Sequence, residues 1–231
     1  MCHRAAIQAG EYWSSCGLPA SAWPGARSAL ERYRRLIAEH NAEAGLTAIE
    51  SAEGFYVKHV ADSLSLLRAL PGAIEGASSV ADVGAGAGLP GVVLAVALPG
   101  ITLTAVESNR RKAAFVALAT KELGLGGRVE VVARRSRELG HDPRYARRFD
   151  LVVARAVAPS AKLIRDCRLL IADGGSAALY KTPAGVSAEL DLARREADRH
   201  AMIVRTSGVI ELPGGAGRRQ FIQVLAPAAG D

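Results

Sequence analysis

The segment VADVGAGAGLPG, residues 80–91, places four glycines directly after an apolar run. Inside a regular element glycine costs about 0.5–1 kcal/mol relative to alanine, so this cluster indicates a backbone that turns tightly or lets a ligand approach closely. In doubly wound α/β folds, the turn between the first strand and its helix lies at the sheet edge where ligands bind. The segment therefore predicts an α/β fold with a ligand site at this turn.

The rest of the chain supports this fold, because from residue 79 short apolar runs alternate with longer helical patterns. We expect strands at 79–83, 102–107, 128–133, 149–155, 176–181, 202–206 and 220–226. We expect helices at 89–97, 109–123, 159–172 and 185–199. This alternation predicts a mostly parallel, seven-stranded sheet covered on both faces. The last two strands have no helix between them and are expected to form an antiparallel hairpin at one edge.

Two helical patterns, over residues 27–45 and 51–70, precede the first strand. The first ends at a glycine and the second at a Pro-Gly pair, as helices commonly do. We therefore expect an N-terminal helical extension, residues 27–72, packed on a main domain over residues 73–231. A further Pro-Gly pair marks off residues 1–26, which we expect to form a flexible leader.

Composition limits the class of protein. The chain is 49% hydrophobic and 23% charged, as in an ordinary soluble globular protein. Its longest apolar stretch is too short to span a bilayer, and its first residues lack the apolar core of a signal peptide. We therefore expect a cytoplasmic protein. Lys and Arg exceed Asp and Glu by 29 to 23, which favours a polyanionic partner.

The cysteines point to no metal site. Cys2, Cys16 and Cys167 are odd in number, widely spaced and without a C-x-x-C pair. This pattern argues against both a disulfide framework and a zinc site. We expect three ordinary reduced thiols.

The spacing of the glycines narrows the choice of ligand. Gly84, Gly86 and Gly88 alternate, whereas the dinucleotide fingerprint is G-x-G-x-x-G, and no P-loop Gly-Lys-Ser/Thr follows. Asp82 precedes the first glycine, and Glu107 ends the second strand, where an acid can accept hydrogen bonds from both hydroxyls of a ribose. This combination is typical of S-adenosylmethionine binders and less so of NAD binders. The alternative is a tight structural turn beside a surface glutamate.

A resemblance rests on longer segments. LTAIES and YVKHVADSLSLL precede the glycine loop, and AVESNRRKAAFV, VVARAVAP and LYK follow it in order. Together with the loop's ending Gly-Leu-Pro-Gly, these segments resemble the glucose-inhibited division protein B family over about Tyr33 to Leu225. Those proteins are methyltransferases that modify guanine N7 of 16S ribosomal RNA. The resemblance implies a Rossmann-like class I methyltransferase fold, with S-adenosylmethionine as cofactor.

Carried over residue by residue, the resemblance implies that Gly84 and Leu89 line the cofactor. It also implies that Ser136 and Arg137 lie beside the adenine and that Arg155, at the end of the fourth strand, is the family's arginine at that place. The chain departs from the family at Lys181, which is followed by Thr-Pro where the family usually has glycine. The loop over 137–149 is also longer and more basic than usual.

The expected reaction needs no catalytic acid or base. Guanine N7 carries a lone pair and no proton, so proximity and alignment can supply most of the acceleration. Arg155 and Lys181 are candidates for orienting the substrate by hydrogen bonds to guanine or to phosphate. His59 and Asp62, on one helix face, are expected to hydrogen-bond each other or the loop backbone, and we do not assign His59 as a base.

Basic runs at 109–112, 134–137, 144–148 and 217–219 indicate a phosphate track. The RNA-binding residues we predict are Arg110, Arg111, Lys181, Arg218 and Arg219. Only 5% of the residues are aromatic, so RNA binding should depend on charge and shape rather than on base stacking. The predicted partner is 16S ribosomal RNA or the small ribosomal subunit.

Three alternatives remain open at this stage. A small-molecule methyltransferase of the same fold would have a closed, aromatic-rich acceptor pocket. A non-catalytic ribosome-binding relative would have a damaged glycine loop or no acid at Glu107. An NAD-dependent oxidoreductase would have G-x-G-x-x-G and a proton donor. The sequence leaves the oligomeric state open, with a monomer favoured.

Overall fold

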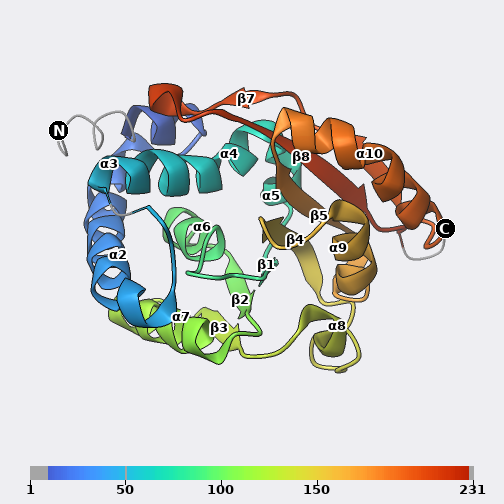
Figure 1. Cartoon of the computed structure of the whole chain (residues 1–231), viewed down its shortest axis with the longest axis horizontal. Coiled ribbons are helices and arrows are strands. Elements are labelled where there is room, and N and C mark those ends of the chain that lie inside the picture. The colour runs from blue at the N-terminus through green and yellow to red at the C-terminus, as the bar shows by residue number, and fades with distance from the viewer. Residues whose placement is uncertain (1–9, 50, 229–231) are drawn as a thin grey trace.

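A computed structural model describes residues 10–49 and 51–228 as a single twisted sheet flanked by helices (Figure 1). The strand order is β3-β2-β1-β4-β5-β8-β6, and β7 pairs with β8 beyond this path. The strands are β1 (Ser79–Val83), β2 (Thr102–Val106), β3 (Val129–Val132), β4 (Phe149–Arg155), β5 (Ile171–Lys181), β6 (Ile203–Thr206), β7 (Ile210–Glu211) and β8 (Arg218–Leu225). Strands β1 to β5 are parallel, whereas β8 runs antiparallel to both of its neighbours.

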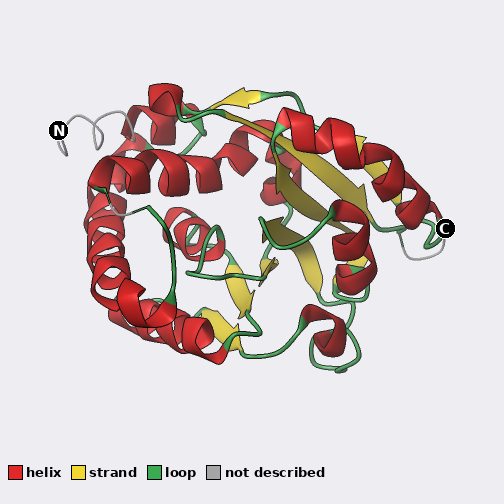
Figure 2. Cartoon of the chain, in the orientation of Figure 1, coloured by secondary structure: helices red, strands yellow, loops and turns green. Residues whose placement is uncertain are grey.

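Helices cover both faces of this sheet (Figure 2). The helical elements are η1 (Ala20–Ala22), α2 (Trp23–Ala44), α3 (Ala52–Gly54), the π-helix η2 (Phe55–Ala61), α4 (Asp62–Ala69), α5 (Pro71–Glu75), α6 (Gly91–Ala97), α7 (Arg110–Glu122), α8 (Ser136–Leu139), α9 (Ser160–Cys167), α10 (Pro183–Asp198) and η3 (Pro213–Gly215). One layer holds α2, α4, α6 and α7, and the other holds α8, α9 and α10. The alternation of β1 shows why both layers are needed: Val80 joins the first core cluster and Ala81 the second. The predicted α/β class and mostly parallel sheet are confirmed.

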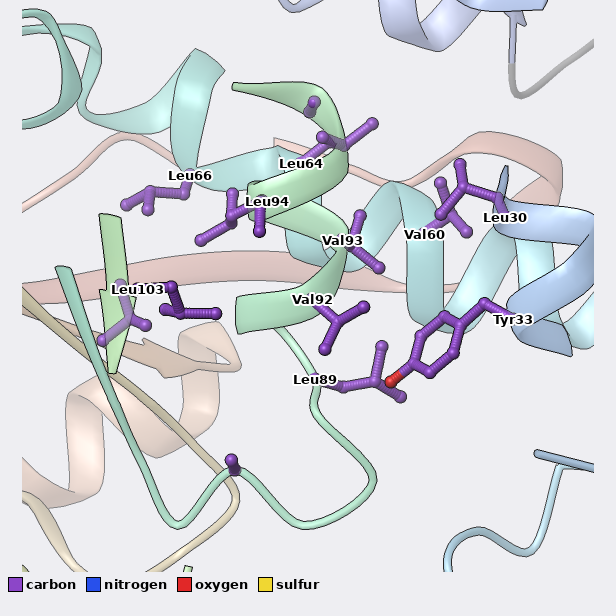
Figure 3. Packing of buried hydrophobic residues seen from close by; sticks show 14 of the residues in the cluster. Leu30, Tyr33, Val60, Leu64, Leu66, Leu89, Val92, Val93, Leu94 and Leu103 are labelled. Atoms are coloured by element: carbon purple, nitrogen blue, oxygen red, sulfur yellow. The ribbon is translucent and has the colours of Figure 1, made fainter. Parts of the chain in front are cut away.

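The first core cluster packs against the glycine loop (Figure 3). Tyr33 projects from α2 toward Leu89, and its hydroxyl donates a hydrogen bond to the carbonyl of Ala87. Tyr33 is fully buried, so the hydroxyl requires this partner. The N-terminal extension thereby contacts the segment that the sequence marked as a ligand site.

The predicted flexible leader is wrong for residues 10–26; residues 1–9 lie outside the described part of the chain, and so does Cys2. Residues 10–15 are helical, and Trp13 is only 1% exposed, with its ring 5.4 Å from that of Trp23. The thiol of Cys16 donates to the carbonyl of Leu64 at 3.6 Å. Burial of these side chains holds the segment on the core, because each would otherwise expose apolar surface.

One expected element boundary needs correction. The helix expected at 159–172 ends at Cys167, a turn occupies residues 168–170, and β5 begins at Ile171. Leu170 packs into the second core cluster from this turn and not from a helix face. The expected antiparallel pair at one edge is confirmed, since β8 pairs antiparallel with β6 at the end of the strand order. A further short strand that the sequence did not predict, β7, also pairs with β8. None of the helices among the described residues has the length and apolar character needed to cross a membrane.

Candidate functional site

The three alternating glycines form a left-handed loop at the carboxyl end of β1. Gly84, Gly86 and Gly88 have φ values of 71°, 58° and 89°, which residues with a side chain rarely adopt. A Cβ on Gly84 would lie 2.5 Å from Val157, and one on Gly88 would lie 2.7 Å from Val92. A Cβ on Gly86 would meet nothing closer than 3.9 Å. The loop is therefore closed on two sides and open at Gly86, where a ligand can approach the backbone.

Glu107, the acid predicted to hold a ribose, lies directly after β2 and points at this loop. Its Oε2 accepts the amide hydrogen of Gly86 at 2.8 Å, and its Oε1 accepts that of Asn109 at 2.7 Å. A carboxylate has about four acceptor positions, so two remain for hydroxyl donors of a ligand. Glu107 thus positions the loop and keeps capacity to bind.

Asp82, also predicted to bind the cofactor, lies beneath the loop. Its Oδ2 accepts the amide hydrogen of Gly91 at 2.8 Å, and a Cβ on Gly91 would approach that oxygen to 2.6 Å. Burial raises the pKa of Asp82 to about 7. Its Oδ1 is buried and has no hydrogen-bond partner among the described residues. The structure therefore places Asp82 as the anchor of the loop's end at α6.

A cleft of about 380 Å³ opens beside Gly84, at the carboxyl ends of the parallel strands. It is lined by Val83, Gly84, Val106, Ser108, Arg134, Arg135, Ser136, Arg137, Val157, Ala158, Lys162, Leu163 and Asp166. The structure thus brings Ser136 and Arg137 to the same cleft as the glycine loop. Leu89, predicted to line it, is instead buried with its side chain in the first core cluster (Figure 3). A larger hollow of about 600 Å³ lies at the opposite, amino ends of the strands, away from the loop.

Comparison with known proteins shows the family to which the chain belongs. A family model described as rRNA small subunit methyltransferase G (GidB) matches residues 26–212. The chain is 35% identical to the ribosomal RNA small subunit methyltransferase G of Synechococcus over 93% of this chain and 84% of that protein. It is 37% identical to that of Burkholderia pseudomallei over 87% and 78%. The chain belongs to the rRNA small subunit methyltransferase G family.

Solved structures support the fold. The cofactor-bound Rv0187 from MTB covers 89% of this chain and 90% of its own length, with a TM-score of 0.56 and 18% identity. The O-methyltransferase TomG from Streptomyces achromogenes, solved in complex with SAM, covers 87% and 90%, also with a TM-score of 0.56 and 18% identity. At this identity the likeness shows the fold alone. The predicted class I methyltransferase fold is confirmed.

The arginine that the family resemblance placed at the end of β4 is part of a buried ion triad. Arg155 donates from Nη1 to Oδ2 of Asp62 at 2.9 Å. Arg219 approaches the same carboxylate from β8 as a fork, with Nε 2.5 Å from Oδ1 and Nη2 2.8 Å from Oδ2. The Asp62 side chain is 4% exposed, and those of Arg155 and Arg219 are 13% and 17% exposed. Two positive charges share one carboxylate, so the triad retains one positive charge at the sheet edge.

His59 does not pair with Asp62, contrary to one of the expected arrangements. Its Nε2 lies 2.9 Å from the hydroxyl of Thr47, and its Nδ1 lies 3.2 Å from the carbonyl of Lys58. Burial, reinforced by the charge of Arg155, lowers the pKa of His59 to about 4. His59 is therefore a neutral structural group that joins the segment after α2 to the π-helix.

The family departure after β5 has a structural explanation. The hydroxyl of Thr182 accepts the amide hydrogen of Gly185 at 3.1 Å, and Pro183 occupies the first position of α10. Thr and Pro are both favoured at these positions. Lys181 donates to Glu189 at 2.8 Å and to the carbonyl of Ala158 at 3.2 Å. Lys181 is therefore held in internal contacts that join β5, α10 and the loop after β4.

The predicted RNA-binding cations divide into two groups. Arg110, Arg111 and Arg218 are exposed and form no ion pair within residues 10–49 and 51–228. Lys181 and Arg219 are turned inward to carboxylates. Arg135 and Arg137, from the basic run at 134–137 that the sequence assigned to the phosphate track, are also exposed. Lys58 is exposed as well, but the sequence gave no signal for it, because its exposure depends on the π-helix.

Val157 is a second residue that the sequence did not single out. It is 43% exposed, although its side chain covers Gly84. Ala156 before it has a φ of 56°, an unfavourable value for a residue with a Cβ. Only the structure shows this arrangement, because an Ala-Val pair carries no signal for a positive φ.

Proposed function

We infer that this protein transfers the methyl group of S-adenosylmethionine to guanine N7 of 16S ribosomal RNA. The observation that carries this inference is the glycine loop with its open side at Gly86, held by Glu107, in a chain of the rRNA small subunit methyltransferase G family. We assign the reaction to the cytoplasm and to 16S RNA within the small ribosomal subunit.

The residues around the cleft fit this cofactor. Glu107 has two free acceptor positions for the two hydroxyls of a ribose. Gly86 leaves its backbone accessible to the methionine part, and Ser136 and Arg137 line the far side of the cleft, where an adenine would extend. Gly84 lines the cleft between these two parts. Asp82 and Leu89 act from beneath by fixing the loop.

The chain's own groups also fit the reaction. When bound, S-adenosylmethionine supplies a methyl group on a positively charged sulfur, which the lone pair of guanine N7 takes as the carbon–sulfur bond breaks. This transfer releases no proton, so the protein has to align the two reactants rather than to accept a proton. His59, neutral and engaged with Thr47, is consistent with that requirement. Arg155 offers guanidinium hydrogens that its single carboxylate contact leaves unused.

Exposed cations support an RNA substrate. Arg110 and Arg111 follow the carboxyl end of β2, and Arg135 and Arg137, which follow β3, line the cleft. Neutralising phosphates with such cations releases counterions and gives salt-dependent affinity. The described residues that line the cleft include no aromatic side chain. This disfavours the alternative of a small-molecule methyltransferase, which would have an aromatic-rich acceptor pocket.

The test is transfer of labelled methyl from S-adenosylmethionine to small ribosomal subunits that lack the modification, compared with naked 16S RNA. The modified base is then mapped. We expect label at one guanine N7 with the unaltered protein and loss of label with Glu107→Ala. Cofactor binding without transfer to either RNA substrate would contradict the RNA assignment and favour a small-molecule acceptor.

A further inference from the structure

A further hollow lies between two segments that are far apart in sequence. It has a volume of about 410 Å³. One wall belongs to the segment that leads into and includes the first turn of the π-helix, and its lining residues are Ala48, Ile49, Ser51, Glu53, Gly54, Val57 and Lys58. The other wall is made by Gly214, Gly215 and Ala216 of the turn between β7 and β8. Neither wall belongs to the glycine loop or to the cleft beside it.

The cations at this hollow are free to bind. Lys58 lines the hollow, is exposed and forms no ion pair with any described residue. Arg218, which follows the glycine turn, is likewise exposed and forms no ion pair with any described residue. Glu53 is the acid among the lining residues, and Glu211 lies opposite Arg218 in the pairing of β7 with β8. These two acids balance Lys58 and Arg218, so the net positive charge near the hollow is the one that the ion triad retains. Lys58 and Arg218 come from different segments and can both contact one anionic strand.

The turn that forms the second wall leaves its backbone accessible. Gly215 and Gly217 have φ values of 67° and 109°, and a Cβ on either would meet no atom within 4 Å. The positive φ at each position by itself favours glycine, and the open space means that the backbone of this turn is accessible to a ligand.

The ion triad fixes both walls to the end of β4. Successive residues of a strand point to opposite sides, so Arg218 faces solvent while Arg219 reaches Asp62. Asp62 follows directly after the π-helix that carries Lys58, and Arg155 also contacts the carbonyl of Lys58 at 3.4 Å. The two exposed cations are therefore held in fixed positions around Arg155, next to the place where methyl transfer is proposed.

We propose that this hollow binds the sugar-phosphate backbone of the RNA that flanks the target guanine, with Lys58 and Arg218 as its phosphate contacts. The proposal rests on the proposed function and adds to it a second RNA contact on the acceptor side of the protein. The cations beside the cofactor cleft and these two would then contact the RNA on either side of the reacting base. Phosphate is the group that two cationic side chains and an open glycine backbone bind most readily.

The test uses the full chain with Lys58→Ala and Arg218→Ala combined, and Arg194→Ala with Arg195→Ala as the matched control. All four arginine and lysine side chains are exposed, so neither double variant removes a core contact. For the first variant we expect KM for RNA to rise and the slope of log affinity against log salt to fall by about 1.4 to 1.8, since each phosphate contact contributes about 0.7 to 0.9. We expect the Kd for S-adenosylmethionine to stay within about twofold and the control to match the unaltered protein in all three measurements.

An unchanged salt slope on naked 16S RNA, with an active unaltered protein, would overturn the proposal. A rise in KM seen with assembled subunits but not with naked RNA would also overturn it, because the hollow would then contact ribosomal protein. If the unaltered protein transfers no methyl to RNA at all, the proposed function fails first, and this outcome is visible without either variant.

Discussion

Glu107 holds Gly86 by a hydrogen bond of 2.8 Å, and this contact joins the end of β2 to the loop that follows β1. The ligand-binding acid and the ligand-binding loop are thus one unit before any ligand arrives. Such preorganisation lowers the cost of ordering the loop on binding.

This relationship predicts how two substitutions at Glu107 differ. Glu107→Ala removes the acceptor for the loop and for the ribose, so we expect the Kd for S-adenosylmethionine to rise by roughly two orders of magnitude, from losing two hydrogen bonds to a charged group at about 1.5 kcal/mol each. Glu107→Gln keeps one carbonyl acceptor and should bind more tightly than Glu107→Ala. Isothermal titration calorimetry measures both. Equal affinities of the two variants for S-adenosylmethionine would contradict a role of the Glu107 acceptor oxygens in cofactor binding.

Gly84 and Val157 predict a suppressor. Gly84→Ala places a methyl group 2.5 Å from a methyl group of Val157, and we expect it to abolish measurable cofactor binding. Adding Val157→Ala removes the atoms in collision, so the double variant should recover part of the affinity. Recovery will be partial, because alanine remains strained at a φ of 71°. Val209→Ala, at another exposed valine, serves as the control and should restore nothing.

The ion triad predicts a loss of stability on removing its carboxylate. Asp62→Ala leaves Arg155 and Arg219 uncompensated, and we expect it to lower the free energy of unfolding by about 3 kcal/mol. Glu122→Ala is the matched control, since it breaks the exposed pair with Arg32 and should cost less than about 1 kcal/mol. Urea unfolding followed by circular dichroism gives both values. Similar losses in the two variants would mean that burial does not strengthen the triad.

Asp82 predicts a pH dependence. Its pKa rises from 3.8 in a model peptide to about 7 in the folded protein, so the folded chain holds a proton that the unfolded chain releases between these values. Stability from this group is therefore full below about pH 4 and is lost as the pH rises toward 7. Asp82→Asn keeps an acceptor for Gly91 and cannot ionise.

We therefore expect Asp82→Asn to gain stability relative to the unaltered protein as the pH is raised from 4.5 to 8, with the change complete near pH 7. Urea unfolding at four pH values checks this difference. Other titrating groups, His59 among them, occur in both proteins and cancel. A difference that does not vary with pH would show that Asp82 ionises normally.

The sequence predicted the parts of this structure that follow from local pattern. The parallel strands and the glycine loop followed from apolar periodicity and from glycine spacing, both of which are set by neighbouring residues. The family followed from the resemblance of longer segments to known proteins. The boundary between α9 and β5 was wrong because Leu170 and Ile171 continue an apolar pattern that a buried helix would also show. Periodicity alone does not separate these cases.

The site was predicted less completely, for a physical reason. Partners such as Arg219 and Asp62 are 157 positions apart, and only the position of β8 brings them together. The sequence showed a basic run at 217–219 but not that alternate residues of the strand face inward and outward. For Cys16 the same holds, since its thiol donates to the carbonyl of Leu64, 48 positions away.

The position of β8 between β5 and β6 has a consequence for synthesis on the ribosome. The strands that β8 separates emerge before it, so a nascent chain that has released residues through Thr206 still lacks the strand that joins them. The Asp62 carboxylate also has no contact with Arg219 until β8 has been synthesised. A premature stop before residue 218 would therefore leave β6 without a neighbour in the sheet, and such a product would be a substrate for proteolysis rather than a shortened enzyme.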